Sequence, residues 1–175
     1  MRKVLYILGE LEDSDLQWMV DAGTLRQIEA GAAIIHEDVP LDSTFIVVAG
    51  EFEVTRADTE IARLGAGEIV GDMSLLDSRP PVATVSAVEE ATVFAIPQKV
   101  LRSKLASDSK FAARFYRALC IFLANRVSRM NVMVNATAAP QGEVEEPDEI
   151  SPETLGNVAL AGARFDWFLK RIRSE

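Results

Sequence analysis

The stretch from Gly65 to Pro97 constrains the fold more than any other part of the sequence. Two spaced glycines precede a short apolar run, and Gly71-Asp72 then leads into a segment with no room for a long helix before Pro80-Pro81. Glycine lets backbone N–H groups approach a ligand closely, and free N–H groups at a helix N-terminus attract anions. The order of strand, glycine, short helix, proline corner and strand therefore predicts a compact loop that holds a phosphate.

Further short strands are predicted on both sides of this loop. After the proline corner, the side chains from Val82 to Ala87 alternate between two faces, as in a half-buried strand. Before the loop, turn residues separate apolar or alternating runs at 31–38, 44–50, 51–56 and 61–64. Short strands that recur roughly every 8–12 residues are typical of a roll or a barrel.

Helical patterns flank the predicted strands. Residues 4–22 predict a helical lead-in, which Ser14-Asp15 can cap and Gly23 can end. After the strands, a long helix is predicted over 110–135, about 40 Å in length. We therefore expect a mainly β fold with α-helices, namely a jelly-roll-like β-roll flanked by N-terminal helices and a long C-terminal helix.

A short helix at 100–105 is expected between the strands and the long helix, and Ser107-Asp108-Ser109 can break and recap the chain there. The long helix itself carries two apolar stripes. The stripe suited to packing on the roll consists of Phe111, Phe115, Leu119 and Phe122. The other steps by four and three residues alternately, as a coiled-coil seam does, through Tyr116, Cys120, Leu123, Val127, Met130 and Val134.

A helix that is apolar on two sides is buried on two sides. The second stripe therefore predicts a homodimer through helix 110–135. The alternative is that the C-terminal segment of the same chain covers this stripe.

The composition changes after the long helix. Residues 136–152 are rich in acidic residues and proline, which predicts an extended linker, and Ser151-Pro152-Glu153 is a good helix start. We thus expect a domain at 1–135 that includes the long helix, an acidic linker at 136–152 and an amphipathic helix at 153–175. This last helix can close over a ligand pocket, cover the long helix or dock on a protein partner.

Charge and composition exclude several functions. The net charge of −9 argues against DNA or an anionic membrane surface as a partner, because phosphates demand clusters of Lys and Arg. One cysteine, no secretory signal and no long apolar span predict a cytoplasmic protein without a membrane span. The single histidine, His36, has no metal-ligand spacing around it, and no catalytic set of residues is visible, so we expect neither a metal site nor an enzyme.

Residues 5–135 resemble cyclic-nucleotide-binding domains, the family of the catabolite activator protein and of kinase regulatory subunits. The phosphate-binding cassette of that family reads roughly Phe-Gly-Glu-x-Ala-Leu-Leu and, a few residues later, Pro-Arg-x-Ala-Thr-Val. The corresponding residues here are Val70-Gly71-Asp72-Met73-Ser74-Leu75-Leu76 and Pro80-Pro81-Val82-Ala83-Thr84-Val85.

The resemblance implies a ligand site at this cassette, in which Asp72 accepts a ribose hydroxyl. Cyclic AMP is the first expected ligand, and no other cofactor is expected. The family's phosphate-binding Arg falls on Pro81, which has neither a charge nor an N–H, and Arg79 can either replace it or remain an exposed turn residue. The expected ligand-binding residues are Gly71, Asp72, Met73, Ser74, Arg79, Val82, Ala83 and Thr84.

Two further observations concern the turns of the roll and the branch of the family that the sequence resembles. Asp38 and Leu41 stand where the family often has turn glycines, so these turns are expected to be built differently. The N-terminal residues, the cassette ending Arg79-Pro80-Pro81 and the tail Leu160–Trp167 resemble a branch common in cyanobacteria, the bacteriocin-type transport-associated cyclic-nucleotide-binding proteins. That resemblance implies an association with peptide export.

Two functions follow from these expectations. In the first, a stand-alone regulatory sensor binds a cyclic nucleotide or a related small anion in a divergent cassette and signals through its long helix. In the second, the cassette is degenerate, and the domain is a dimeric scaffold that binds a protein partner through the long helix and the C-terminal helix.

Overall fold

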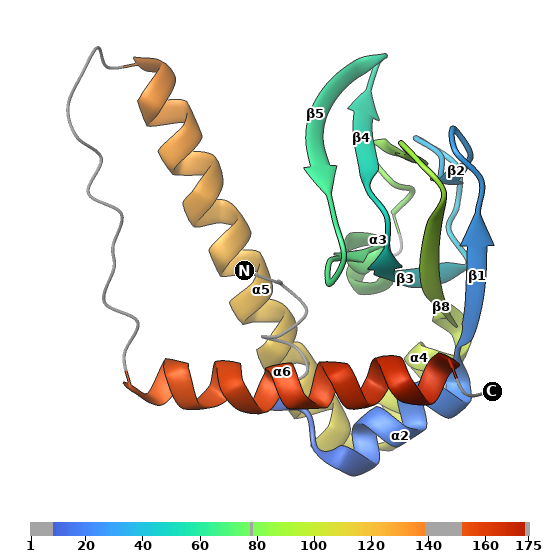
Figure 1. Ribbon diagram of the computed structural model, residues 1–175, viewed down its shortest axis with the longest axis vertical. Helices are drawn as coiled ribbons and strands as arrows, with labels where there is room; N and C mark the ends of the chain where they lie inside the picture. Colours follow the sequence, from blue (N-terminus) through green and yellow to red (C-terminus); the bar gives the residue numbers. More distant parts are fainter. Residues whose placement is uncertain (1–8, 78, 139–151, 174–175) are drawn as a thin grey trace.

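The computed structural model describes residues 9–77, 79–138 and 152–173 of the chain. In this part of the chain, eight strands form two four-stranded antiparallel sheets that face each other, and the helices lie at one end and along one side (Figure 1). The expected β-roll with flanking helices is therefore confirmed. The predicted helical residues 4–8 and most of the predicted linker 136–152 lie outside the described residues.

The first sheet has the order β1-β8-β3-β6, and the second has the order β2-β7-β4-β5. Every strand pair is antiparallel. The bounds of the first sheet's strands are β1 Thr24–Ile28, β8 Ala91–Pro97, β3 Ser43–Ala49 and β6 Ile69–Val70. Those of the second sheet are β2 Ala33–Ile35, β7 Thr84–Ala87, β4 Phe52–Arg56 and β5 Thr59–Leu64.

Strand β3 is buried on both faces, which explains its unbroken apolar run. Successive side chains of a strand point to opposite faces. Phe45 and Val47 accordingly point between the two sheets, where they pack with Phe52 and Val85, while Ile46 and Val48 point toward the helices. The first sheet is thus the shared wall of two apolar cores, one inside the roll and one beneath it.

The N-terminal helix α2, Asp13–Ala22, begins earlier than expected. Its N-cap is Glu12, whose side chain and that of Asp15 form a reciprocal capping box, so the predicted cap at Ser14-Asp15 was wrong. Gly23 follows the last residue of the helix, as predicted. Because the backbone N–H of Glu12 and the carboxylate of Asp15 satisfy each other, no separate serine cap is needed.

The predicted break before the long helix is confirmed. Helix α4 spans Gln98–Ser107 and helix α5 spans Ser109–Ala138, with Asp108 between them. The Asp108 carboxylate accepts a hydrogen bond from the backbone N–H of Phe111 at 3.0 Å, which caps α5. This hydrogen bond, together with the nearby Lys104 ammonium, lowers the pKa of Asp108.

The first stripe of α5 packs as predicted, because Phe111, Phe115 and Leu119 are buried in the helical core. The Phe122, Met130 and Val134 side chains lie outside the described residues. On the second stripe, Leu123 packs against the core, whereas Tyr116, Cys120 and Val127 are exposed, Val127 to 57%. The exposed side chains of this stripe are what a partner would cover.

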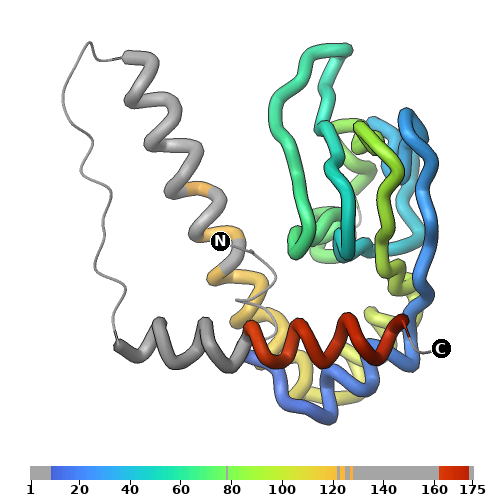
Figure 2. The backbone as a smooth tube through the Cα atoms, in the orientation of Figure 1, coloured from blue at the N-terminus to red at the C-terminus, as the bar shows by residue number. Residues whose placement is uncertain are grey.

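Helix α6, Pro152–Arg173, docks on the underside of the roll. Its buried Phe165, Phe168 and Ile172 belong to the helical core. The ring of Phe168 packs edge-on against Phe94 of β8, with 5.1 Å between the ring centroids. The C-terminal part of α6 runs beside α2 and below β1 (Figure 2). This helix therefore covers the outer face of the first sheet, which was not among the three expected docking places.

Ion pairs join the N-terminal part of α2 to helices α5 and α6. Arg114 of α5 donates two hydrogen bonds to the buried carboxylate of Asp15, at 2.7 and 2.9 Å. These bonds raise the pKa of Arg114. Arg164 of α6 donates to Asp13 at 3.1 Å and to the backbone oxygen of Gly9, also at 3.1 Å. The three helices thus form one base under the roll.

Candidate functional site

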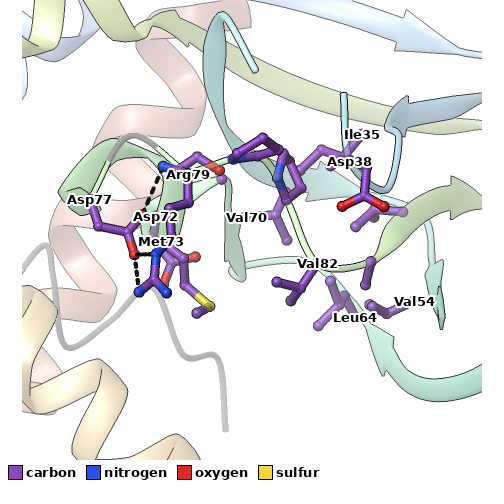
Figure 3. Close-up of a pocket in the computed structure, with 16 residues that line it drawn as sticks. Ile35, Asp38, Val54, Leu64, Val70, Asp72, Met73, Asp77, Arg79 and Val82 are labelled. Atoms are coloured by element: carbon purple, nitrogen blue, oxygen red, sulfur yellow. Dashed lines mark hydrogen bonds and ion pairs between the residues drawn. The ribbon is translucent and has the colours of Figure 1, made fainter. Parts of the chain in front are cut away.

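A cavity of about 360 Å³ lies between the short helix α3, Asp72–Asp77, and the inner face of the second sheet. One of its walls is apolar and comes from the strands, while the other comes from α3 and the proline corner (Figure 3). The apolar wall consists of Ile35, Val54, Leu64, Val70, Ala83 and Val85.

Gly71 makes the turn from β6 into α3. It has a φ of +84°, a conformation that favours glycine. A Cβ atom added there would lie 2.7 Å from Leu41 Cδ2 and 3.1 Å from the backbone oxygen of Ser43, so a side chain at this position would be crowded as well as strained. The pairing of Val70 with Phe45 attaches this turn to the first sheet, and the turn places α3 beside the cavity.

Two side chains of α4 hold the backbone of α3. Gln98 donates a hydrogen bond to the backbone oxygen of Gly71 at 3.2 Å. Arg102 donates to the backbone oxygen of Ser74 at 2.6 Å. Sequence reasoning missed both residues, because nothing in their spacing shows which carbonyl groups they reach. They join the cavity wall directly to the helices beneath it.

The proline corner is pinned to the loop after β2. The backbone N–H of Asp38 donates to the backbone oxygen of Pro81 at 2.9 Å, and the backbone N–H of Glu37 donates to Thr84 Oγ1 at 3.0 Å. Asp38 has a φ of +59°, the left-handed conformation that a turn glycine usually supplies and that aspartate tolerates. Aspartate therefore takes a glycine-like conformation here, and the expectation that this turn differs from the family's stays a prediction.

Arg79 lies at the cavity wall and is paired with its neighbour Asp77. Its backbone N–H donates to Asp77 Oδ1 at 3.0 Å, and its Nε donates to Oδ2 at 2.6 Å (Figure 3). The backbone N–H of Arg79 and then its guanidinium lower the pKa of Asp77. The guanidinium of Arg79 is exposed, and in this structure it forms an ion pair with the Asp77 carboxylate.

The structure brings together all but one of the residues expected at the ligand site. The exception is Thr84, which does not line the cavity and whose hydroxyl accepts the Glu37 N–H. The expected residues that line it are Gly71, Asp72, Met73, Ser74, Arg79, Val82 and Ala83. Among these, Asp72 is buried, whereas Met73 and Val82 are exposed at the rim.

Sequence reasoning missed two acidic residues and most of the apolar wall. Asp38 and Asp77 both line the cavity. The inward-facing positions of β4 and β5 could have been found from strand alternation, but the register that brings Val54 and Leu64 to the cavity comes only from the fold. Asp38 had a signal, since it stands where the resemblance expects glycine.

Two other features of the described residues bear on function. No group of three or more possible metal ligands occurs among them, and His36 is exposed in the loop after β2. Within the same described part of the chain, every helix is too short or too polar to cross a bilayer.

Comparison with known proteins agrees with this architecture. Residues 25–108, which run from β1 through α4, match the family described as the cyclic nucleotide-binding domain. The Pycsar effector protein PaPycTIR of Pseudomonas aeruginosa is 31% identical to the chain over 116 residues. The match covers 66% of this chain but only 37% of that relative.

Two solved structures share the fold. A cyclic nucleotide-binding domain from Methylobacillus flagellatus superposes with a TM-score of 0.70 at 20% identity, covering 81% of this chain and 85% of that one. The catabolite activator protein of Thermus thermophilus superposes with a TM-score of 0.63 at 17% identity, covering 97% and 87%. At these identities the likeness is one of fold.

Proposed function

We propose that this chain is a regulatory sensor, without catalytic activity, that binds a cyclic nucleotide or a chemically related small molecule in the cavity behind α3. The observation that carries the proposal is that hydrogen bonds connect the cavity wall to helix α4 below it. Gln98 and Arg102 of α4 each bond a backbone oxygen of the segment that a ligand would touch. The family match of residues 25–108 supports a ligand of this class.

Asp72 is the residue that we expect to anchor the ligand. It opens α3, lines the cavity and is 4% exposed, so its carboxylate is well shielded from bulk water. A buried carboxylate forms a strong hydrogen bond with a hydroxyl group. The apolar wall opposite suits the flat face of a base. Cyclic AMP is the first ligand to test.

Binding would be transmitted by a shift of α3 relative to α4. A ligand changes the position of a helix only by binding one position better than the other. Movement of α3 alters the distance from Ser74 to Arg102, and α4 leads without a loop into α5 through Asp108. We therefore propose that ligand binding is read out at α5.

A second copy of the chain is the partner that we propose for α5. The exposed Tyr116, Cys120 and Val127 lie on the stripe with coiled-coil spacing, and the main contacts of α6 are with α2 and β1. The same exposed face favours the second candidate function, a dimeric scaffold whose degenerate cassette binds no ligand. An export-linked partner would fit the resemblance to the transport-associated branch.

Isothermal titration of the dialysed protein tests the first proposal. The ligands are cyclic AMP, cyclic GMP, cyclic dinucleotides and the parent nucleosides. We expect saturable binding of at least one of them, weakened about tenfold or more in Asp72→Ala, because a hydrogen bond to a charged acceptor is lost. Asp58→Asn, on the distant β4–β5 turn, serves as the control. An Arg79→Ala variant tests whether that residue contributes.

The readout at α5 is tested by hydrogen exchange on the same samples. A ligand that acts as proposed changes exchange in α4 and the start of α5, and this change is reduced in Arg102→Met while binding persists. If none of the ligands gives heat or changes thermal stability, the sensor proposal fails and the scaffold function is favoured.

A further inference from the structure

A second cavity, of about 560 Å³, lies where the loop before β3, helix α3 and helix α4 come together. Arg79 lines this cavity as well as the first one, whereas α4 contributes only to the second. Among the described residues that line it, the basic side chains are Arg79, Lys99 and Arg102, and the acidic side chain is Asp42. The chain as a whole has a net charge of −9, so the charge of this cavity is the reverse of the overall balance.

Arg102 differs from the other half-buried basic side chains of the described residues. These others are Lys104, Arg114 and Arg164, and each forms an ion pair with an aspartate. Arg102 has no acidic partner within the described part of the chain. Its Nη2 donates instead to two neutral oxygens, the backbone oxygen of Ser74 at 2.6 Å and Gln98 Oε1 at 3.4 Å. A charge that is partly removed from water is stabilised when an opposite charge faces it, so this guanidinium favours an anion beside it.

Lys99 adds a second cation to the same cavity. It lies three residues before Arg102 on α4, a spacing that puts both side chains on neighbouring positions of the helix surface. Lys99 is exposed, and neither it nor Asp42 forms an ion pair within the described residues. The third cation, Arg79, is paired with Asp77, which does not line this cavity. Two cations without an acidic partner therefore share one turn of a helix at the cavity wall.

The Arg102 side chain is already held in position. Gln98 is 5% exposed, and its amide group donates to the backbone oxygen of Gly71 at 3.2 Å while its Oε1 faces Arg102. Within the described residues, the Nε and Nη1 groups of Arg102 make no hydrogen bond, so both are available as donors. A donor that is fixed before a ligand arrives loses less conformational entropy on binding.

We infer that this second cavity is a binding site for a phosphate group, carried by a free phosphate ion or by a small phosphate ester. A phosphate monoester has a charge of about −1.5 to −2 near neutral pH, which matches the two unpaired cations, whereas a carboxylate matches only one. Guanidinium and ammonium groups are the side chains that bind phosphate oxygens most strongly. Neither Lys99 nor Arg102 lines the first cavity, so the inference does not depend on what that cavity binds.

The probes for this site are inorganic phosphate and glycerol 3-phosphate. Each is titrated into the dialysed protein and followed by isothermal titration and by thermal unfolding. Potassium chloride at the same ionic strength is the reference, because salt screens exposed charges in general. We expect saturable binding of at least one probe and a melting temperature that rises with its concentration. Tighter binding of the ester would point to a phosphorylated metabolite, and tighter binding of inorganic phosphate to the free ion.

Two variants remove the proposed contacts. Arg102→Gln removes the charged donors, so the affinity for the probe should fall about tenfold or more. Lys99→Gln removes an exposed charge, so the affinity should fall about threefold. Lys110→Gln is the matched control, because Lys110 is an exposed lysine in the first turn of α5 that does not line the cavity. This control should leave the affinity unchanged.

The outcomes separate this inference from the sensor proposal. If neither probe binds the wild type, the inference is overturned. Binding that Lys99→Gln and Arg102→Gln leave unchanged would show an adventitious ion only, and an equal loss in Lys110→Gln would show an effect of net charge; either result overturns the inference. Should circular dichroism show that Arg102→Gln is unfolded, the exposed Lys99 decides the question through Lys99→Gln. The cyclic nucleotide titrations test the first cavity independently of these results.

Discussion

Replacement of Phe168 by alanine should destabilise the whole domain, although the residue belongs to the C-terminal helix. Phe168 is 0% exposed and packs edge-on against Phe94, at the centre of the core between α6 and the first sheet. Burial of a phenylalanine side chain contributes about 1.5–3 kcal/mol, and the aromatic pair adds about 0.5–1.5 kcal/mol. With the cavity left behind, we expect a loss of about 3–5 kcal/mol in the free energy of unfolding.

Urea unfolding followed by tryptophan fluorescence and far-UV circular dichroism measures this loss. With a dependence on urea of about 2 kcal/mol per molar, the midpoint should fall by about 2 M. Trp167→Ala is the matched control for circular dichroism, because Trp167 is the next residue of the same helix and is 41% exposed. That variant should lose less than about 1 kcal/mol.

The reasoning fails if Phe168→Ala and Trp167→Ala have the same small effect. Such a result would mean that α6 does not unfold together with the roll, whatever its contacts. A midpoint that falls for only one of the two spectroscopic probes would mean that the helix detaches first, and the loss would then be assigned to docking of α6 rather than to the domain.

Three more predictions concern the turn, the cap and the dimer. Gly71→Ala should destabilise the protein by about 2 kcal/mol or more, as measured by thermal unfolding, because of its φ of +84° and the approach to Leu41; an unchanged melting temperature would contradict this. Wild type should be more stable than Asp108→Asn by a full margin above the unfolded-state pKa of about 4, and this margin should disappear as the pH falls through the lower folded-state pKa. A constant difference in urea midpoint across that range would rule out a contribution of the charge. Val127→Glu should leave the far-UV circular dichroism spectrum of the folded protein unchanged but convert a dimer to a monomer in sedimentation velocity, and a wild type that sediments as a monomer would refute the proposed interface.

Much of the architecture could be predicted from local patterns. The alternation of Ala83 and Val85 with exposed Val82 indicated a half-buried strand, and in the structure the first two are buried. The cap at Asp108 could be read because its carboxylate satisfies an N–H group only three residues away. Such features depend on neighbours in the sequence, so the sequence shows them.

The candidate site was only partly predictable. The cassette residues are contiguous, and a resemblance located them. The apolar wall required the pairing of β4 with β5, and Asp38 reaches the site because its N–H bonds Pro81, 43 residues later in the chain by the printed numbering. Contacts over such separations depend on the whole topology, and no local pattern encodes them.

Sequence alone therefore determined the β-roll, the glycine turn before α3, the break at Asp108 and the amphipathic character of the C-terminal helix. Only the tertiary structure decided that this helix packs on Phe94, that Arg102 holds the carbonyl group of Ser74, and that three carboxylates share a cavity with one paired guanidinium. The physical reason is that periodicity and turn chemistry act over a few residues. Apolar burial and the electrostatic field of a cavity are sums over side chains that only the fold brings together.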